Sequence, residues 1–294
     1  MPVFADVLPV SCLLEEAVRG VETPVKAGTL ECKATGMKWK PQPLLLRHGR
    51  FNQRVVLRPL EPGIPLPSFS HRHHSPHVLQ PIAAIRDSPS GDTWRGSKCY
   101  LAFPFCQYGN LVEYVMTQKA MDVRLSARHA AMIARDVVLG VEGLLENDCE
   151  HSPAQVVSSI MPTKIFIALN GTAKVMAPIN TGRPQSWRKM AMTMKWMSPE
   201  EVQDVPVERS NMWQVISYRV GLLLYCLGSQ DAGIGHMVPN FVQDAPNPNQ
   251  VDMSQCQQSG LLRQLVEECL RLGQLCVPPP RDILMSMLDA IIMG

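Results

Sequence analysis

The sequence of 294 residues lacks several features that would assign it to common functional classes. It has no G-x-G-x-x-G motif for cradling phosphates, no G-x-S-x-G motif of a serine hydrolase and no CxxC pair of a structural zinc site. Its charged residues make up only 18%, with a net charge of +2, so we expect no nucleic-acid partner. The longest uncharged apolar run, residues 220–228, is far shorter than the ~20 residues of a membrane-spanning helix.

The composition is that of a folded protein with a large core. Hydrophobic residues make up 46% of the chain, which argues against disorder. The first residues, MPVFADVLPVSCLL, carry no positively charged segment, so we predict no signal peptide there. A chain whose signal had been removed would look the same, and both a secreted and a cytoplasmic location stay open.

Cysteine is abundant, and the number of cysteines is odd. The nine are Cys12, Cys32, Cys99, Cys106, Cys149, Cys226, Cys256, Cys269 and Cys276. Two interpretations fit: buried reduced thiols, or several disulfides with one thiol left over in an oxidising compartment. Cys226 and Cys269 lie in apolar helical patterns, which favours buried thiols for these two.

Strand signals dominate the first third of the chain. Ser11 and Gly20 frame a predicted short helix over 11–20. Strand-like stretches follow at 29–39, 43–51, 52–60, 77–87 and 98–106. Five prolines between residues 59 and 76 exclude a regular helix there.

From residue 111 the hydrophobic period becomes helical. We predict helices over 111–119, 126–147, 211–227, 260–273 and 280–293. Two strands flank Asn170-Gly171-Thr172, because Asn-Gly is a strong hairpin signal. The order predicts an α+β protein with an N-terminal extension (1–39), a β-rich lobe (40–104) and a helical lobe (105–294).

Five strings in this order resemble the bilobed protein kinase fold. They are CYLAFPFCQYGNLVEYV, PTKIFIALNGTAKV, KWMSPEE, LVEECLRL and PRDIL, and they span about residues 40–293. In this alignment Phe103 is the gatekeeper, and residues 177–200 form an activation segment of ordinary length. The resemblance implies a small β-rich N-lobe and a helical C-lobe. The helix that follows the third N-lobe strand in kinases is expected to be altered or missing, because only 18 proline-rich residues separate Arg58 from His77.

The positions of the kinase catalytic groups hold other residue types. Arg58 stands at the lysine that pairs with phosphates, and Glu61 is too near Arg58 to be its helix-borne partner. Ser159 replaces the catalytic aspartate, Met161 the following lysine and Lys164 the metal-binding asparagine. Ala177, Pro178 and Ile179 replace the Asp-Phe-Gly triplet. Phosphoryl transfer needs these charges and carboxylates, so the resemblance implies an inactive pseudokinase. A water-facing arginine on an edge strand is an equal interpretation of Arg58.

Two further departures concern stability. Glu200 ends the Ser-Pro-Glu tripeptide, and Val277 holds the place of its usual arginine partner, so we expect Glu200 to be unpaired unless Arg281 reaches it. The helix at 211–227 fits the kinase pattern in two ways, one from Asn211 and Trp213 and the other from Gly221.

Other constellations compete less well. His71, His73, His74 and His77 resemble a zinc or copper site, but a solvated loop is favoured because no carboxylate or thiolate lies nearby. The methionine-rich residues 189–197 suggest either a partner surface or a packed activation segment, and we favour the latter. We predict no metal site.

The expected function is therefore that of a non-catalytic scaffold for a protein partner. Phe103, Met176 and Pro178 are expected to occlude the nucleotide cleft, so we predict neither ATP–Mg binding nor a cofactor. Two alternatives stay open: a transferase that holds nucleotide through Arg58 and Lys164 without metal, and an unrelated α+β fold. The extension, the cysteines and the altered N-lobe also resemble the secreted rhoptry-type kinase family of apicomplexan parasites and its bradyzoite pseudokinase relatives, which would favour secretion with disulfides.

Overall fold

The protein is a mixed α+β chain. A computed structural model describes residues 7–9, 13–16, 22–24, 44–48, 51–60, 75–86, 99–123, 125–146, 151–179, 196–228, 260–271 and 278–294. Contacts between residues divide the chain into two compact units. Unit 1 comprises Met1–Arg72, Leu79–Phe105 and Ile179–Pro184, and unit 2 comprises His73–Val78, Cys106–Pro178 and Gln185–Gly294.

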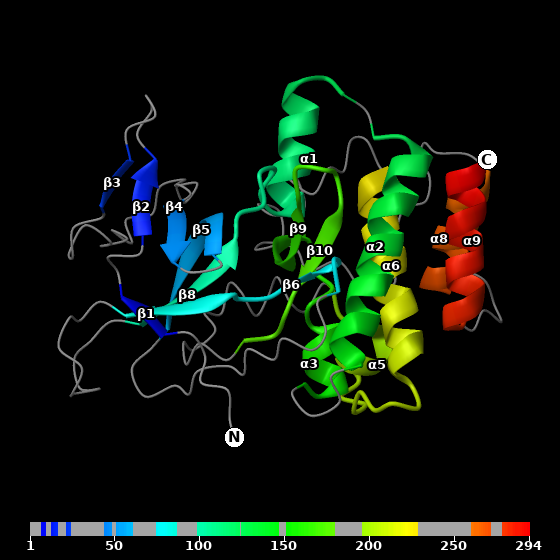
Figure 1. Ribbon diagram of the computed structural model, residues 1–294. Helices are drawn as coiled ribbons and strands as arrows, with labels where there is room; N and C mark the ends of the chain where they lie inside the picture. Colours follow the sequence, from blue (N-terminus) through cyan, green and yellow to red (C-terminus); the bar gives the residue numbers. More distant parts are fainter. Residues whose placement is uncertain are drawn as a thin grey trace, which may run out of the picture. The chain divides into compact units, whose positions relative to one another are not determined.

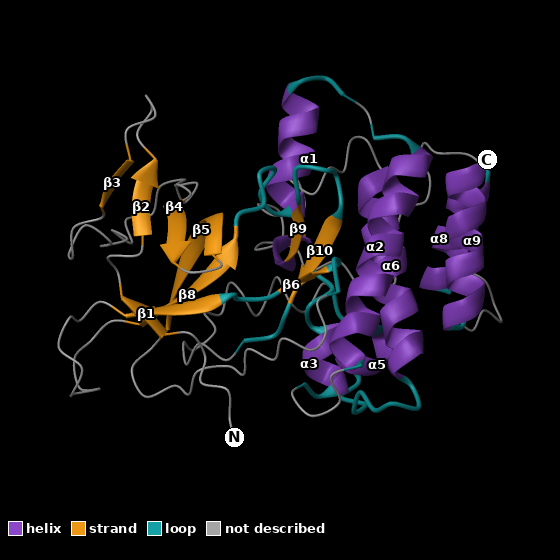
Figure 2. Cartoon of the chain, viewed as in Figure 1, coloured by secondary structure: helices purple, strands orange, loops and turns teal. Residues whose placement is uncertain are grey.

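Unit 1 contains a seven-stranded sheet (Figures 1 and 2). Its strands are β1 (Val7–Pro9), β2 (Leu13–Glu16), β3 (Glu22–Pro24), β4 (Leu44–His48), β5 (Phe51–Leu60), β7 (Ala83–Arg86) and β8 (Cys99–Pro104). They lie in the order β1-β7-β8-β5-β4-β2-β3. Neighbours are antiparallel except β1 and β7, which run parallel.

Two neighbouring strands of this sheet, β7 and β8, carry apolar stretches that are fully buried. In β8, Leu101 and Ala102 are fully buried, as are Ala83, Ala84 and Ile85 of β7. Short continuous apolar runs are typical of strands buried on both faces. The strands predicted at 43–51, 52–60 and 98–106 are confirmed. The stretch 77–87 divides into two strands of different sheets, Val78–Leu79 and Ala83–Arg86, and the stretch 29–39 lies outside the described residues.

The short helix predicted over 11–20 is wrong. Leu13–Glu16 is instead the strand β2, with backbone pairing to β3 on one side and β4 on the other. A helix of ten residues is marginal by itself, whereas a strand between two neighbours satisfies its backbone donors and acceptors on both edges. The capping signals Ser11 and Gly20 were outweighed by pairing with residues distant in sequence.

Unit 2 is mainly helical. Its helices are α1 (Leu111–Ala120), α2 (Ala127–Leu145), α3 (Pro153–Val157), α5 (Pro199–Val202), α6 (Met212–Gly228), α8 (Leu261–Leu270) and α9 (Arg281–Met293). A 3₁₀ turn, η2 (Pro162–Lys164), precedes the strands β9 (Ile165–Ile167) and β10 (Ala173–Met176). A third strand, β6 (Val78–Leu79), pairs with β10. The five longer predicted helices and the β9–β10 hairpin are confirmed.

The helix α2 shows how the sequence sets this core. Ser126 caps its start by accepting a hydrogen bond from the His129 amide at 3.2 Å. Its predicted apolar stripe, which includes Ile133, Val137 and Val141, is fully or almost fully buried. The helix packs against α6 and α9 in Figure 1.

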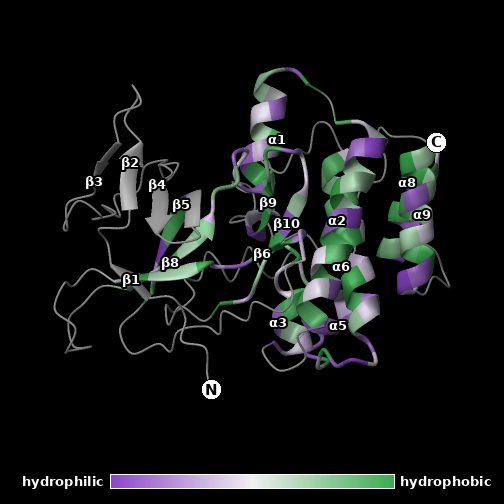
Figure 3. Cartoon of the chain, in the orientation of Figure 1, coloured by the Kyte–Doolittle hydropathy of each residue, from purple (hydrophilic) through white to green (hydrophobic). Residues whose placement is uncertain are grey.

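The helix α6 lies at the centre of unit 2. Every residue from Val215 to Gly228 is buried, so this helix is buried on all sides rather than on one stripe, although it includes polar residues such as Arg219 (Figure 3). Gly221 faces α8 so closely that an added Cβ would lie 2.5 Å from the Cβ of Cys269. The absence of a side chain at Gly221 therefore permits the close approach of α6 and α8.

The described part of the chain includes no helix with the length and apolar character needed to cross a membrane.

Candidate functional site

The residues aligned with the kinase catalytic loop follow the short helix α3. Ser152 begins this helix with a capping box: its Oγ accepts from the Gln155 amide, and the Gln155 side chain accepts from the Ser152 amide. Pro153 occupies the first helical position, where a missing N–H has no cost. The helix ends at Val157, and Ser158, Ser159 and Ile160 turn the chain into η2.

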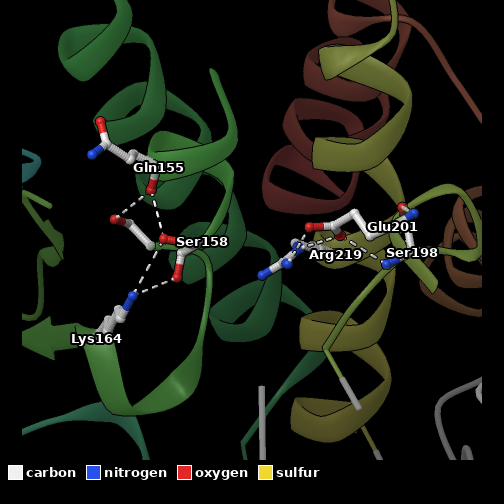
Figure 4. A network of polar contacts seen from close by, with 7 residues as sticks. Gln155, Ser158, Lys164, Ser198, Glu201 and Arg219 are labelled. Atoms are coloured by element: carbon white, nitrogen blue, oxygen red, sulfur yellow. Dashed lines mark hydrogen bonds and ion pairs between the residues drawn. The ribbon is translucent and has the colours of Figure 1, made fainter. Parts of the chain in front are cut away.

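A lysine closes this loop (Figure 4). The Lys164 Nζ donates to the Ser158 carbonyl at 2.8 Å and to the Ser158 Oγ at 3.4 Å. The Ser158 hydroxyl in turn donates to the Gln155 carbonyl at 2.7 Å. The ammonium group thus supplies a hydrogen-bond donor to the Ser158 carbonyl at the C-terminal end of α3. A cation is favoured there because carbonyl oxygens carry the negative end of the helix dipole.

The other positions of this loop are occupied by buried groups. Ser159 is fully buried, and its Oγ lies 3.4 Å from the Gln155 carbonyl. Met161 and Ala177 belong to one apolar core cluster of unit 2. Met176 is also buried, and Pro178 is half-buried. Ile179 belongs to unit 1. The structure thus brings Ser159, Met161 and Lys164 onto one turn.

In unit 1, Arg58 and Phe103 lie together. Val56 is opposite Phe103 in the β5–β8 pair, so Arg58 is the diagonal neighbour of Phe103 on the same face. The Arg58 guanidinium carbon lies 5.9 Å from the centre of the Phe103 ring, within the range of a cation–π contact. Burial lowers the pKa of Arg58. Arg58 is thus half-buried with its guanidinium over the Phe103 ring, and its interpretations as a phosphate-pairing or a water-facing residue both stay predictions.

Sequence reasoning missed a buried ion pair beside the Ser-Pro-Glu tripeptide (Figure 4). Arg219 of α6 is 1% exposed and donates to both carboxylate oxygens of Glu201, at 3.0 and 2.7 Å. Glu201 also accepts from the Ser198 amide at 2.9 Å, which completes a capping box at the start of α5. The Ser-x-x-Glu spacing of residues 198–201 is a capping-box signal that was available in the sequence.

The expectation for Glu200 is wrong in its partner. Glu200 pairs with Arg271, the residue after α8, at 2.5 Å, whereas Arg281 pairs with Glu142 of α2 and with Asp282. Partial burial raises the pKa of Glu200, but a hydrogen bond from its own amide and the Arg271 side chain outweigh burial and leave the pKa lowered. The αL conformation of Arg271 (φ 56°) places it after the last helical turn. Val277 lies outside the described residues.

A second missed cluster joins β6, β10 and α2. The Asp136 Oδ2 accepts from the Ala173 amide at 2.9 Å, and its Oδ1 lies 3.3 Å from the Nδ1 of His77. Burial raises the pKa of Asp136, and this outweighs the hydrogen bond from Ala173 and the nearby cations, which lower it. His77 precedes β6, and its carbonyl accepts from the Val175 amide at 2.8 Å. The expectation of a solvated loop without a nearby carboxylate is wrong for His77, because its ring is half-buried beside Asp136. His71, His73, His74 and residues 189–195 lie outside the described residues.

The chemistry available at these positions is limited. Within the described ranges, no three His, Cys, Asp or Glu side chains gather in a way that could hold a metal ion. Among the described residues no disulfide joins the cysteines, which are Cys99, Cys106, Cys226 and Cys269. The last two are buried, as the helical pattern predicted.

Comparison with models of protein families and with curated proteins finds no match for this chain.

Proposed function

We propose that this chain is a pseudokinase, a kinase-like protein that acts as a non-catalytic scaffold for a protein partner. The observation that supports it best is Lys164. At the position aligned with a metal-binding asparagine, this side chain holds the Ser158 carbonyl at 2.8 Å. A cation there repels magnesium, and its hydrogen bonds stabilise the loop in place of a metal.

The neighbouring positions support the same proposal. A kinase needs a carboxylate at the attacking hydroxyl and another on the magnesium ions. Here the corresponding residues are Ser159, which is fully buried, and Ala177, a methyl group in the apolar core of unit 2. A serine hydroxyl cannot act as the base that takes a proton near neutral pH, and the methyl group of Ala177 has no atom that binds a metal ion.

In unit 1, the cation at the position of the phosphate-pairing lysine lies against an aromatic ring. The contact of Arg58 with Phe103 occupies the guanidinium face. The planar fork of arginine is also larger than the ammonium it would replace. Nucleotide binding through Arg58 would require this contact to be given up.

The test is binding and transfer measured on the same preparation. We expect no rise in melting temperature with ATP, with or without Mg²⁺, and no radiolabel transfer from ATP to the chain or to a generic protein substrate. An active protein kinase measured in parallel is the positive control. A rise of several degrees with ATP–Mg would contradict the proposed loss of nucleotide binding. Transfer that disappears in Arg58→Ala but persists in Arg58→Lys would replace the scaffold by a metal-independent transferase.

A further inference from the structure

The turn between β9 and β10 contains a tripeptide that is also a sequence motif for covalent modification. Asn170-Gly171-Thr172 is the only Asn-x-Ser/Thr sequence in the chain in which x is not proline. This tripeptide is the acceptor motif for N-linked oligosaccharide, which requires an asparagine on an accessible surface loop. The hairpin in which it lies is described completely and is visible in Figure 1.

The turn presents the asparagine in an ordered conformation. The Asn170 side chain is exposed, and its Oδ1 accepts from the Thr172 amide at 3.2 Å. This hydrogen bond forms an Asx-turn, in which the asparagine side chain bonds to the backbone two residues later, here at Thr172. Because Oδ1 takes the main-chain N–H, the amide nitrogen Nδ2, which is the atom that receives sugar, lies outside this contact.

The surroundings leave room for a bulky group. A Cβ added to Gly171 would meet no atom within 4 Å. Gly171 has a φ of +81°, a backbone conformation that only glycine adopts readily, so the turn is tight. Leu169, the residue before the motif, is 66% exposed, and a sugar on Asn170 would cover this apolar side chain.

Exposed Asn-Gly pairs have another reaction open to them, deamidation. In that reaction the Gly171 nitrogen attacks the Asn170 Cγ, ammonia leaves, and the succinimide is hydrolysed by water. Here the Gly171 amide donates to the Ala168 carbonyl at 2.9 Å, so the attacking nitrogen is held in the turn. The geometry of the hairpin therefore works against deamidation while leaving Nδ2 accessible.

We propose that Asn170 is an acceptor site for an N-linked glycan, independently of the proposed scaffold function. The donor is an oligosaccharide joined to a lipid pyrophosphate, which the transferase of the secretory pathway supplies. A bond forms between Nδ2 and the anomeric carbon of the first sugar, the bond from that carbon to the lipid pyrophosphate breaks, and Nδ2 loses one proton. The modified end of the hairpin is then shielded from protein partners.

The test uses the full chain made in cultured eukaryotic cells behind a cleavable secretory leader. The peptide containing Asn170 is analysed by mass spectrometry from both the medium and the total cell protein, so that retention in the cell does not hide it. Half of each sample is first treated with peptide:N-glycosidase in ¹⁸O-labelled water. We expect a glycopeptide before treatment and a peptide with Asn170→Asp carrying one ¹⁸O after it.

Matched variants separate the motif from general effects on folding. Asn170→Gln and Thr172→Ala should lose the glycan, whereas Thr172→Ser, which keeps the motif, should retain it. All three lie on an exposed turn and should melt close to the unglycosylated wild type. An unmodified wild-type peptide in both samples would overturn the proposal. Conversion of Asn170→Asp without enzyme and without ¹⁸O would overturn it in favour of deamidation.

Discussion

Lys164 and Asp136 are charged side chains whose main partners are main-chain groups. Lys164 donates to the carbonyl of Ser158, and Asp136 accepts from the amide of Ala173. Lys164 thereby holds the C-terminal end of α3, and Asp136 holds the first residue of β10. In each case a single side chain makes the contact with the backbone. At this scale, these two charged side chains stabilise the backbone of unit 2.

The raised pKa of Asp136 predicts how stability depends on pH. Since burial favours the neutral carboxyl in the folded state, the contribution of Asp136 is largest when it is protonated, below its ordinary value of 3.8. That contribution is lost as pH rises through the raised folded-state pKa. Asp136→Asn keeps an oxygen for the Ala173 amide and removes the charge. Wild type should therefore lose stability relative to Asp136→Asn as pH rises from about 3 to about 7.

Urea unfolding of both proteins across this pH range checks the prediction. Asp136→Ala is the matched variant: it removes the acceptor as well and should be about 1–3 kcal/mol less stable than Asp136→Asn at every pH. A wild type that gains stability over Asp136→Asn with rising pH would show that His77 and the nearby cations outweigh burial.

At the scale of elements, α6 organises unit 2 through two unlike contacts. Towards α5 it offers Arg219, which is 1% exposed and bidentate on Glu201. Towards α8 it offers Gly221, whose missing side chain admits Cys269. The ion pair positions α5 against α6 through charge, and the close packing at Gly221 positions α8 against α6.

Removal of the buried arginine should be strongly destabilising. Arg219→Met leaves the Glu201 carboxylate partly buried without its cation, which should lower the free energy of unfolding by about 3–5 kcal/mol. Arg263→Met is the control, because Arg263 and Glu267 form an exposed pair one turn apart, worth about 0.3–0.5 kcal/mol. The double variant Arg219→Met/Glu201→Gln should recover part of the loss. Equal midpoints for Arg219→Met and Arg263→Met in urea would refute this prediction.

A methyl group added at Gly221 should also lower the stability of the protein. In Gly221→Ala the new Cβ would lie 2.5 Å from the Cβ of Cys269, so α6 and α8 must separate. Overpacking of this kind costs about 1–3 kcal/mol, against a gain of about 0.5–1 kcal/mol from alanine in a helix. We expect a net loss in thermal or urea unfolding. Gln214→Ala, at an exposed position in the first turn of the same helix, should not be destabilising. A Gly221→Ala as stable as Gln214→Ala would contradict the close approach.

These elements also show what the sequence could predict. The α2 stripe and the Asn-Gly hairpin were legible because their signals are local: a period of 3.6 residues and a turn that needs glycine. The strand Leu13–Glu16 was not, because its structure depends on pairing with β4, about thirty residues later. The partner of Glu200 was missed for the same reason: Arg271 reaches it from the end of α8, and no spacing in the sequence indicates that contact.

At the scale of the whole molecule, the described thiols report on global unfolding. Cys226 and Cys269 lie on α6 and α8 and are almost completely buried. Burial raises the pKa of Cys226 to about 12 and raises that of Cys269, where the nearby Glu268 adds to the effect. The thiolate of either residue is therefore strongly disfavoured while α6 and α8 stay packed, and it forms readily only when unit 2 unfolds.

Alkylation should follow that opening. Native protein treated with iodoacetamide near pH 8 should leave Cys226 and Cys269 unlabelled, whereas both should react fully in urea. Peptide mapping measures the labelled fraction at each residue. Cys99, which is half-buried in unit 1, is the internal comparison and should react earlier. Rapid native labelling of Cys269 would mean that α8 separates from α6 without global unfolding.

The parallel pairing of β1 with β7 bears on how the protein is made. Val7–Pro9 is translated well before its partner residues, Ala84 to Arg86. Until β7 is made, β1 lacks this pairing, whereas β2, β3, β4 and β5 can already form antiparallel pairs with one another. Pairing between segments so distant in sequence is slow, so β1 joins the sheet late in biosynthesis. A nascent chain stalled before β7 would carry β1 without this partner, and an unpaired strand is a target for chaperones.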